Sequence, residues 1–136
     1  MGFTWLERWQ PQLLAILRIV AGLLFLEHGT SKFFDFPVAF PLPGQLPAML
    51  MVAGAIEIVA GLLITLGLFT RLAAFIASGL MAAAYFIGHF PKGFWPLENM
   101  GEAAILYCFV FLYIAAAGPG EWSIDNRRAG EPRVRA

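Results

Sequence analysis

The chain has 136 residues and a formal net charge of zero, with 60% of its residues hydrophobic and only 13% charged. Soluble domains carry about twice that share of charged residues. Together with a mean hydropathy of +0.73, these values exclude an ordinary soluble domain and predict an integral membrane protein. The sequence has no nucleotide, phosphate or nucleic-acid motif, so no nucleic acid is expected as a partner.

Four apolar stretches approach the length of about 20 residues that a helix needs to cross a bilayer about 30 Å thick. They run from Leu13 to Phe33, Ala48 to Leu68, Leu72 to His89 and Gly101 to Gly118. We therefore predict an all-α fold, a transmembrane four-helix bundle, as a single domain over residues 1–126. Residues 127–136 are predicted to form a short, basic and mobile tail.

The basic residues are distributed unequally between the two sides that four spans define. One side holds six arginines, at positions 8, 71, 127, 128, 133 and 135, and the other holds only Lys32 and Lys92. Because basic residues are retained in the cytoplasm, both termini are predicted to be cytoplasmic. Arg18 interrupts the first apolar run and no small-residue cleavage site follows it, so this run is expected to stay in the mature protein.

The first span places polar and small residues on one helix face. Arg18, Gly22, Phe25, Gly29 and Lys32 follow one another at spacings of 4, 3, 4 and 3, and His28 borders this face. The next segment, residues 34–47, contains four prolines among aromatic residues. It is therefore predicted to be an irregular apolar loop on the outer membrane surface.

The second span carries Gly54, Glu57, Gly61 and Thr65 on one face, where small residues let a neighbouring helix approach closely. Arg18 and Glu57 are the charges deepest in the apolar runs, and each costs about 2.5 to 3.5 kcal/mol at the centre of a membrane helix. Their depths differ by about 7.5 Å, which long side chains can bridge. We predict an ion pair between them that holds the first two helices together, with a proton or ligand role as the alternative.

Four polar residues from three spans are predicted to converge near the outer surface. They are His28 and Lys32 in the first span, His89 at the end of the third, and Glu102 at the start of the fourth. A quinone head group needs hydrogen-bond donors and a proton source inside an apolar, aromatic pocket, and this layer offers both. We therefore predict that these four residues bind a quinone.

Each of the four residues also has a structural interpretation. Asn99 and Glu102 have the spacing of a helix capping box. Lys32 is long enough to extend to the interface, and both histidines fit plain interfacial positions. Two histidines near one surface also match a bis-histidine haem b, a weak pattern that any such pair would satisfy. No closely spaced ligands predict a metal site, and the single cysteine, Cys108, excludes an internal disulfide.

The chain resembles the DoxX family from Leu13 to Asp125. The resemblance is carried by Arg18, Gly22, Phe25, His28-Gly29 and Lys32, then Gly54-x-x-Glu57-x-x-x-Gly61, then His89-Phe90-Pro91-Lys92-Gly93-Phe94-Trp95 before Glu102, and finally Gly118-Pro119-Gly120-x-x-Ser123-x-Asp125. One departure is Met100, where relatives often have a second glycine.

The resemblance implies a small four-helix protein of the bacterial inner membrane that is associated with redox work at the quinone pool. We predict a quinone-interacting subunit of an oxidoreductase or oxidative-stress complex, whose protein partner carries the redox centre. The alternatives are a small proton-coupled transporter that uses Glu57, and a structural or assembly subunit without its own ligand. The bilayer is the other expected partner, and a homodimer is considered without assigning a face.

Overall fold

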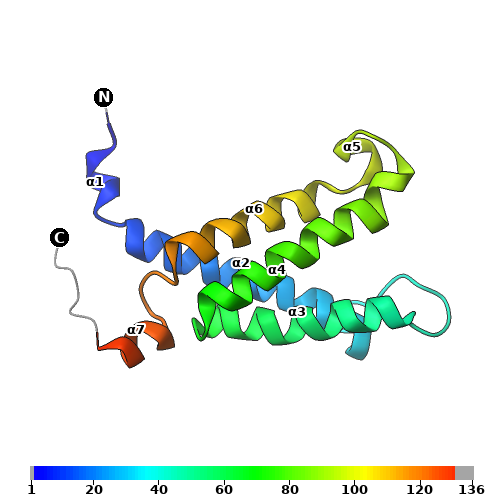
Figure 1. Ribbon diagram of the computed structural model, residues 1–136, viewed down its shortest axis with the longest axis horizontal. Coiled ribbons are helices and arrows are strands. Elements are labelled where there is room, and N and C mark those ends of the chain that lie inside the picture. The colour runs from blue at the N-terminus through cyan, green and yellow to red at the C-terminus, as the bar shows by residue number, and fades with distance from the viewer. Residues whose placement is uncertain (1, 131–136) are drawn as a thin grey trace.

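The structure, a computed structural model, describes residues 2–130, and all the regular elements in this part of the chain are helical. Four long helices lie side by side and alternate in direction (Figure 1): α2 (Gln10–Phe34), α3 (Ala48–Leu66), α4 (Thr70–Ala84) and α6 (Glu102–Ala117). Short helices α1 (Thr4–Glu7), α5 (Pro96–Asn99) and α7 (Ile124–Ala129) lie at the ends of the bundle. A π-helical turn, η1 (Tyr85–His89), and a 3-10 turn, η2 (Phe90–Lys92), extend α4.

Three helical segments are long and apolar enough to cross a membrane: Gln10–Phe34, Ala48–Leu66 and Thr70–Lys92. This confirms the predicted all-helical membrane protein. The fourth predicted span appears as α6, an apolar helix of 16 residues, or about 24 Å at 1.5 Å per residue. That length is marginal for a bilayer, so the fourth crossing stays a prediction.

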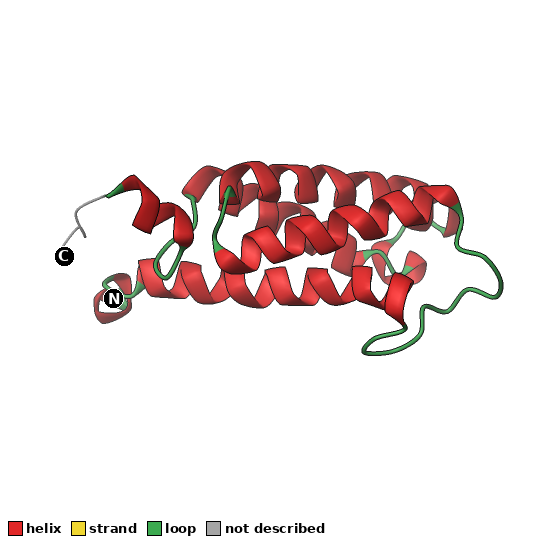
Figure 2. Cartoon of the chain, turned by 90° about the horizontal axis from the view of Figure 1, so that it is seen from below, coloured by secondary structure: helices red, strands yellow, loops and turns green. Residues whose placement is uncertain are grey.

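The four long helices pack as two pairs. α2 lies along α3 and α4 lies along α6, whereas α3 and α4 share a smaller contact and α2 and α6 meet only sparsely. Figure 2 shows, from below, the long helices running along one another. Phe25 of α2 and Phe111 of α6 are buried in the core with their ring centroids 4.9 Å apart. Large apolar side chains such as Val59, Phe75 and Leu106 are exposed on the outside, where lipid would cover them.

The helices α1 and α7 lie at one end of the bundle, together with the turn between α3 and α4 (Figure 1). We call this the inner end, and the opposite end, with the α2–α3 loop and α5, the outer end. Their common position is what an even number of crossings produces. The side of the membrane that each end faces stays a prediction.

The segment after α6 folds back onto the inner end and caps α4. The carboxylate of Asp125 accepts hydrogen bonds from the backbone N–H of Phe69 and Thr70, both at 2.9 Å, and from the Thr70 hydroxyl at 2.7 Å. Burial alone would raise the pKa of Asp125, but these bonds and the charge of Arg128 outweigh it and hold that pKa below its ordinary value. A carboxylate here also suits the positive end of the α4 dipole.

Two predictions concern segments outside the long helices. The segment between α2 and α3 is irregular, as its prolines indicated. The first residues of the predicted tail, 127–129, belong to α7, at whose N-terminus Ser123 accepts a hydrogen bond from the N–H of Asn126. The rest of that tail, residues 131–136, lies outside the described residues.

Candidate functional site

Lys32 and Glu57 form a buried ion pair between α2 and α3. Their Nζ and Oε2 atoms are 2.7 Å apart, and the two side chains are 6% and 5% exposed. Within residues 2–130 this is the only salt bridge. A buried pair of this kind is costly to desolvate, and it is stable only when both charges are satisfied together.

Close packing of α2 on α3 brings the two residues together. A Cβ atom at Gly29 would lie 2.7 Å from the Gly54 carbonyl oxygen, so only glycine allows the helices to approach this far. Gly54 in turn leaves room for the stem of Lys32, because a Cβ there would lie 3.2 Å from the lysine Cδ. Lys32 therefore crosses α3 at Gly54 and reaches Glu57 one helical turn further along.

The ammonium group of Lys32 has two further neighbours. It donates a hydrogen bond of 3.3 Å to the His28 carbonyl, and it lies 5.0 Å from the centroid of the Phe40 ring, which belongs to the outer loop. A cation over an aromatic face is favoured, more so when it is desolvated. Lys32 is thus held inside the bundle, and the interpretation in which it extends to the interface is wrong.

A small cavity of about 120 Å³ lies beside this pair at the outer end of α2. Its lining is Glu27, His28, Ser31, Pro37, Val38 and Phe40. The outer loop is held over it by hydrogen bonds from the Ser31 hydroxyl to the Val38 carbonyl, at 2.7 Å, and from the Thr30 hydroxyl to the Phe36 carbonyl, at 2.8 Å. The cavity and the ion pair share His28 and Phe40 as neighbours.

His28 presents one ring nitrogen to its own helix and leaves the other without a hydrogen-bond partner among the described residues. Its Nδ1 donates to the Leu24 carbonyl at 2.7 Å, because a carbonyl can only accept. In the neutral ring Nε2 is then the acceptor, and within the described residues it has no hydrogen-bond partner. The ring also meets Tyr107 of α6 edge-on, with centroids 6.0 Å apart.

The predicted ion pair between Arg18 and Glu57 is wrong. Gly22 packs against Thr65 and Gly29 against Gly54, and this antiparallel register places Arg18 beside Gly67 at the inner end. Gly67 is ten residues beyond Glu57, which corresponds to about 15 Å along the helix axis, and not 7.5 Å.

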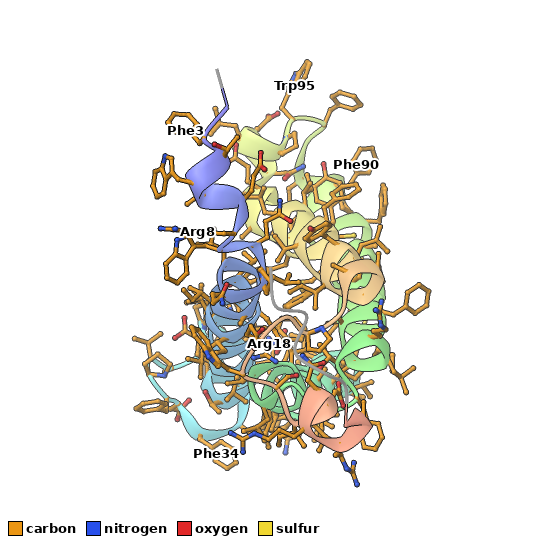
Figure 3. The ribbon with its side chains drawn as sticks, turned by 90° about the vertical axis from the view of Figure 1, so that its left-hand side faces the viewer. Phe3, Arg8, Arg18, Phe34, Phe90 and Trp95 are labelled. Atoms are coloured by element: carbon orange, nitrogen blue, oxygen red, sulfur yellow. The ribbon has the colours of Figure 1, made fainter. Side chains whose placement is uncertain are left out.

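Arg18 is completely buried and bonds to the segment that follows α6. Its Nη2 donates to the carbonyls of Trp122 at 3.0 Å and Glu121 at 3.3 Å. In a view along the bundle from the inner end, Arg18 lies among the helices, whereas Phe34, Phe90 and Trp95 lie at the periphery (Figure 3). Its role in the structure is to fasten the loop before α7 to α2.

His89 belongs to a different cluster, which organises the α4–α6 connection. Its Nδ1 donates to the Asn99 carbonyl at 3.0 Å, and its ring is stacked on Tyr85 with centroids 6.5 Å apart. The buried Asn99 side chain donates to the Gly93 carbonyl at 2.9 Å and accepts from the N–H of Gly101 at 2.8 Å.

Glu102 is the exposed first residue of α6, and Gly101 is its N-cap, so the predicted capping box with Asn99 is absent. In the described residues no hydrogen bond or salt bridge joins His89 or Glu102 to His28 or Lys32. The structure therefore supports one group of His28, Lys32 and Glu57, and a separate one around His89.

Residues that the sequence did not assign to the site are Ser31, Val38 and Phe40, which line the cavity. Val38 and Phe40 gave a weak signal, because a proline-rich loop has no periodicity from which its contacts can be predicted, whereas Ser31 lies on α2 next to Lys32 in the sequence. Among residues 2–130 no cluster of three potential metal ligands is present.

The family model for DoxX matches residues 13–90, which cover most of α2 and all of α3, α4 and η1. The chain belongs to the DoxX family. This confirms the resemblance, and the matched segment contains both Lys32 and Glu57. No solved structure matches the chain.

Relatives that match most of the chain come from several bacteria. An uncharacterised protein of Haemophilus influenzae is 49% identical over 129 residues, covering 90% of this chain and 95% of its own. The inner membrane protein YphA of Escherichia coli is 30% identical, with 87% and 91% covered. A Bacillus subtilis protein named putative oxidoreductase CatD is 36% identical over 115 residues, with 81% and 82% covered.

Proposed function

We propose that this DoxX-family protein binds a quinone head group at the outer end of the bundle and supplies protons to it. The electrons would come from a protein partner that carries the redox centre. The name of the Bacillus subtilis relative, putative oxidoreductase, supports redox work in this family. The observation that carries the proposal is the buried Lys32–Glu57 pair, 2.7 Å apart, next to the cavity that His28 lines.

The residues of this group fit the proton chemistry that quinone reduction requires. A quinone takes up electrons and protons together, so its site needs hydrogen-bond donors and a proton source. Lys32 can pass a proton to Glu57, whereas an arginine in its place would hold its proton permanently. His28 Nε2 can accept a proton and donate it onward, because within the described residues it has no hydrogen-bond partner.

The experiment measures the affinity of the purified protein for a short-chain quinone by calorimetry. We expect His28→Gln to weaken binding about ten-fold, as the loss of one hydrogen bond to a charged or polar partner does. The double variant Lys32→Met with Glu57→Leu should weaken it further without leaving an unpaired charge. His89→Gln and Lys92→Met are the controls, and both should bind as the wild type does.

Several outcomes would contradict the proposal. One is a wild-type protein that binds no quinone. Another is a folded His28→Gln variant whose affinity for the quinone is unchanged. If His89→Gln weakened binding as much as His28→Gln, the original four-residue site would be favoured over the narrower one. The absence of any ligand, combined with loss of a partner protein on deletion of this one, would favour an assembly subunit.

One observation favours a second candidate, a proton-coupled transporter. Glu57 is a buried carboxylate inside a membrane-spanning helix, and its partner is a lysine, which can release its proton. This alternative predicts proton-coupled flux in liposomes and its loss in Glu57→Gln with the fold intact. Liposomes of wild-type protein that show no flux would exclude it.

A further inference from the structure

A wide groove lies at the inner end of the bundle, where α2 and α6 separate. It has a volume of about 1100 Å³ and is bounded by the first two turns of α2, the last turns of α6, and α7. α2 and α6 meet only sparsely, so packing between them does not fill this space. It lies at the opposite end of the bundle from the Lys32–Glu57 pair and is independent of the function proposed above.

The lining of the groove changes from apolar to basic along the bundle axis. Leu13, Leu17 and Tyr113 line the part between α2 and α6. Arg71, on the first turn of α4, and Arg127, on α7, line the part at the end of the bundle. The groove therefore has the polarity of a single lipid, with its chains toward the bilayer centre and its head group at the surface.

The charge of the groove favours an anionic head group. It is lined by two arginines and one glutamate, Glu121, which leaves one formal positive charge. Within residues 2–130 the only salt bridge joins Lys32 to Glu57, so neither arginine has a carboxylate within 4.0 Å. Arg71 does donate through Nη1 to the Ala115 carbonyl at 3.0 Å, which positions its guanidinium at the end of α6.

We propose that this groove binds an anionic phospholipid of the surrounding bilayer, with the phosphate between Arg71 and Arg127 and the acyl chains along Leu13, Leu17 and Tyr113. Arginine suits the head group because its planar fork matches phosphate oxygens. The apolar half of the groove selects a lipid over free phosphate. Basic pockets between helices at a membrane surface bind acidic head groups in this way.

The test compares phosphatidylglycerol with phosphatidylcholine of identical acyl chains, titrated into the purified full-length protein and followed by native mass spectrometry. We expect phosphatidylglycerol to be retained in preference. Arg127→Gln should weaken its binding about five-fold, the usual effect of one basic residue on an anionic lipid. Arg128→Gln is the matched control, since it removes the same charge from the neighbouring position of α7 but does not line the groove.

A second pair of variants tests the groove itself. Ala117→Trp places a bulky ring in the groove, and it should prevent retention of the lipid. Ala116→Trp is its control, because Ala116 is also exposed but does not line the groove. Unfolding midpoints would verify that all four variants are folded. Equal binding of the two lipids, equal loss in Arg127→Gln and Arg128→Gln, or unchanged binding in Ala117→Trp would each overturn the proposal.

Discussion

Lys32 reaches Glu57 across Gly54, where a missing side chain leaves room for the lysine stem. The lysine is satisfied on three sides, by a carboxylate, a backbone carbonyl and the Phe40 ring. Arg18, although it is on the same helix face, finds backbone carbonyls at the inner end instead. Two buried cations on one helix face therefore differ in their surroundings: Lys32 is paired next to a cavity, and Arg18 fastens a loop.

The ion pair predicts a non-additive effect of substitution on stability. Lys32→Met or Glu57→Leu alone should lower the free energy of unfolding by about 3 to 5 kcal/mol, because each leaves one buried charge unpaired. The double variant should lose clearly less than either single one. Circular dichroism during unfolding in detergent measures this, with Lys92→Met as an exposed control. Losses that simply add in the double variant would show that the two charges do not stabilise each other.

At the level of elements, α7 is a clamp on the inner end of the bundle. The Asp125 carboxylate accepts hydrogen bonds from the N–H groups at the start of α4, and the Asp125 backbone N–H donates to the Gly67 carbonyl at 2.8 Å. A helix begins with N–H groups that have no partner within it, so a carboxylate from another segment completes the cap. The Gly118-Pro119-Gly120 motif allows this return, since Gly118 and Gly120 have φ values of 91° and 70°.

The clamp predicts that stability depends on pH through Asp125. Its folded pKa lies below the ordinary value, so its stabilisation is present at neutral pH and is lost as the pH falls below about 4 toward the folded pKa. Asp125→Ala should cost about 1 kcal/mol at pH 7, the usual effect of losing a helix cap. In thermal unfolding between pH 3 and pH 7, the difference in stability between the wild type and Asp125→Ala should become smaller as the pH falls.

Glu121→Ala provides the control for this prediction, because it removes a carboxylate from the same loop without removing the cap. Its difference from the wild type should not follow the same pH profile. A difference for Asp125→Ala that stays constant from pH 7 down to pH 3 would mean that the carboxylate charge does not contribute to the cap.

At the level of the whole molecule, the bundle consists of two helix pairs whose ends alternate between the two sides. The inner end holds α1, α7 and the α3–α4 turn, and the outer end holds the proline-rich loop and α5 (Figure 1). Tryptophans lie at both ends, with Trp9 and Trp122 at the inner end and Trp95 at the outer, as expected for side chains at the two membrane interfaces.

This arrangement predicts which loops share a side of the membrane, and so whether α6 crosses it. In a Cys108→Ser background, Gln45→Cys and Leu97→Cys should react with an impermeant maleimide on intact spheroplasts. Arg128→Cys should react only after permeabilisation, because basic residues mark the cytoplasmic side. Reaction of Arg128→Cys on intact cells together with Leu97→Cys would show that the 16-residue α6 does not cross.

The sequence by itself determined the membrane class, the family and the positions of the helices. Those properties depend on the length of the apolar runs and on short spacings between residues, both of which can be read along the chain. The first residues of α3 and α6 lie at, or one residue from, the first residues of the predicted spans. Only the tertiary structure decided that Glu57 pairs with Lys32 and not with Arg18. The partner depends on the antiparallel register of α2 on α3, which glycine contacts such as Gly29 on Gly54 set, and a small error in estimated depth changes it.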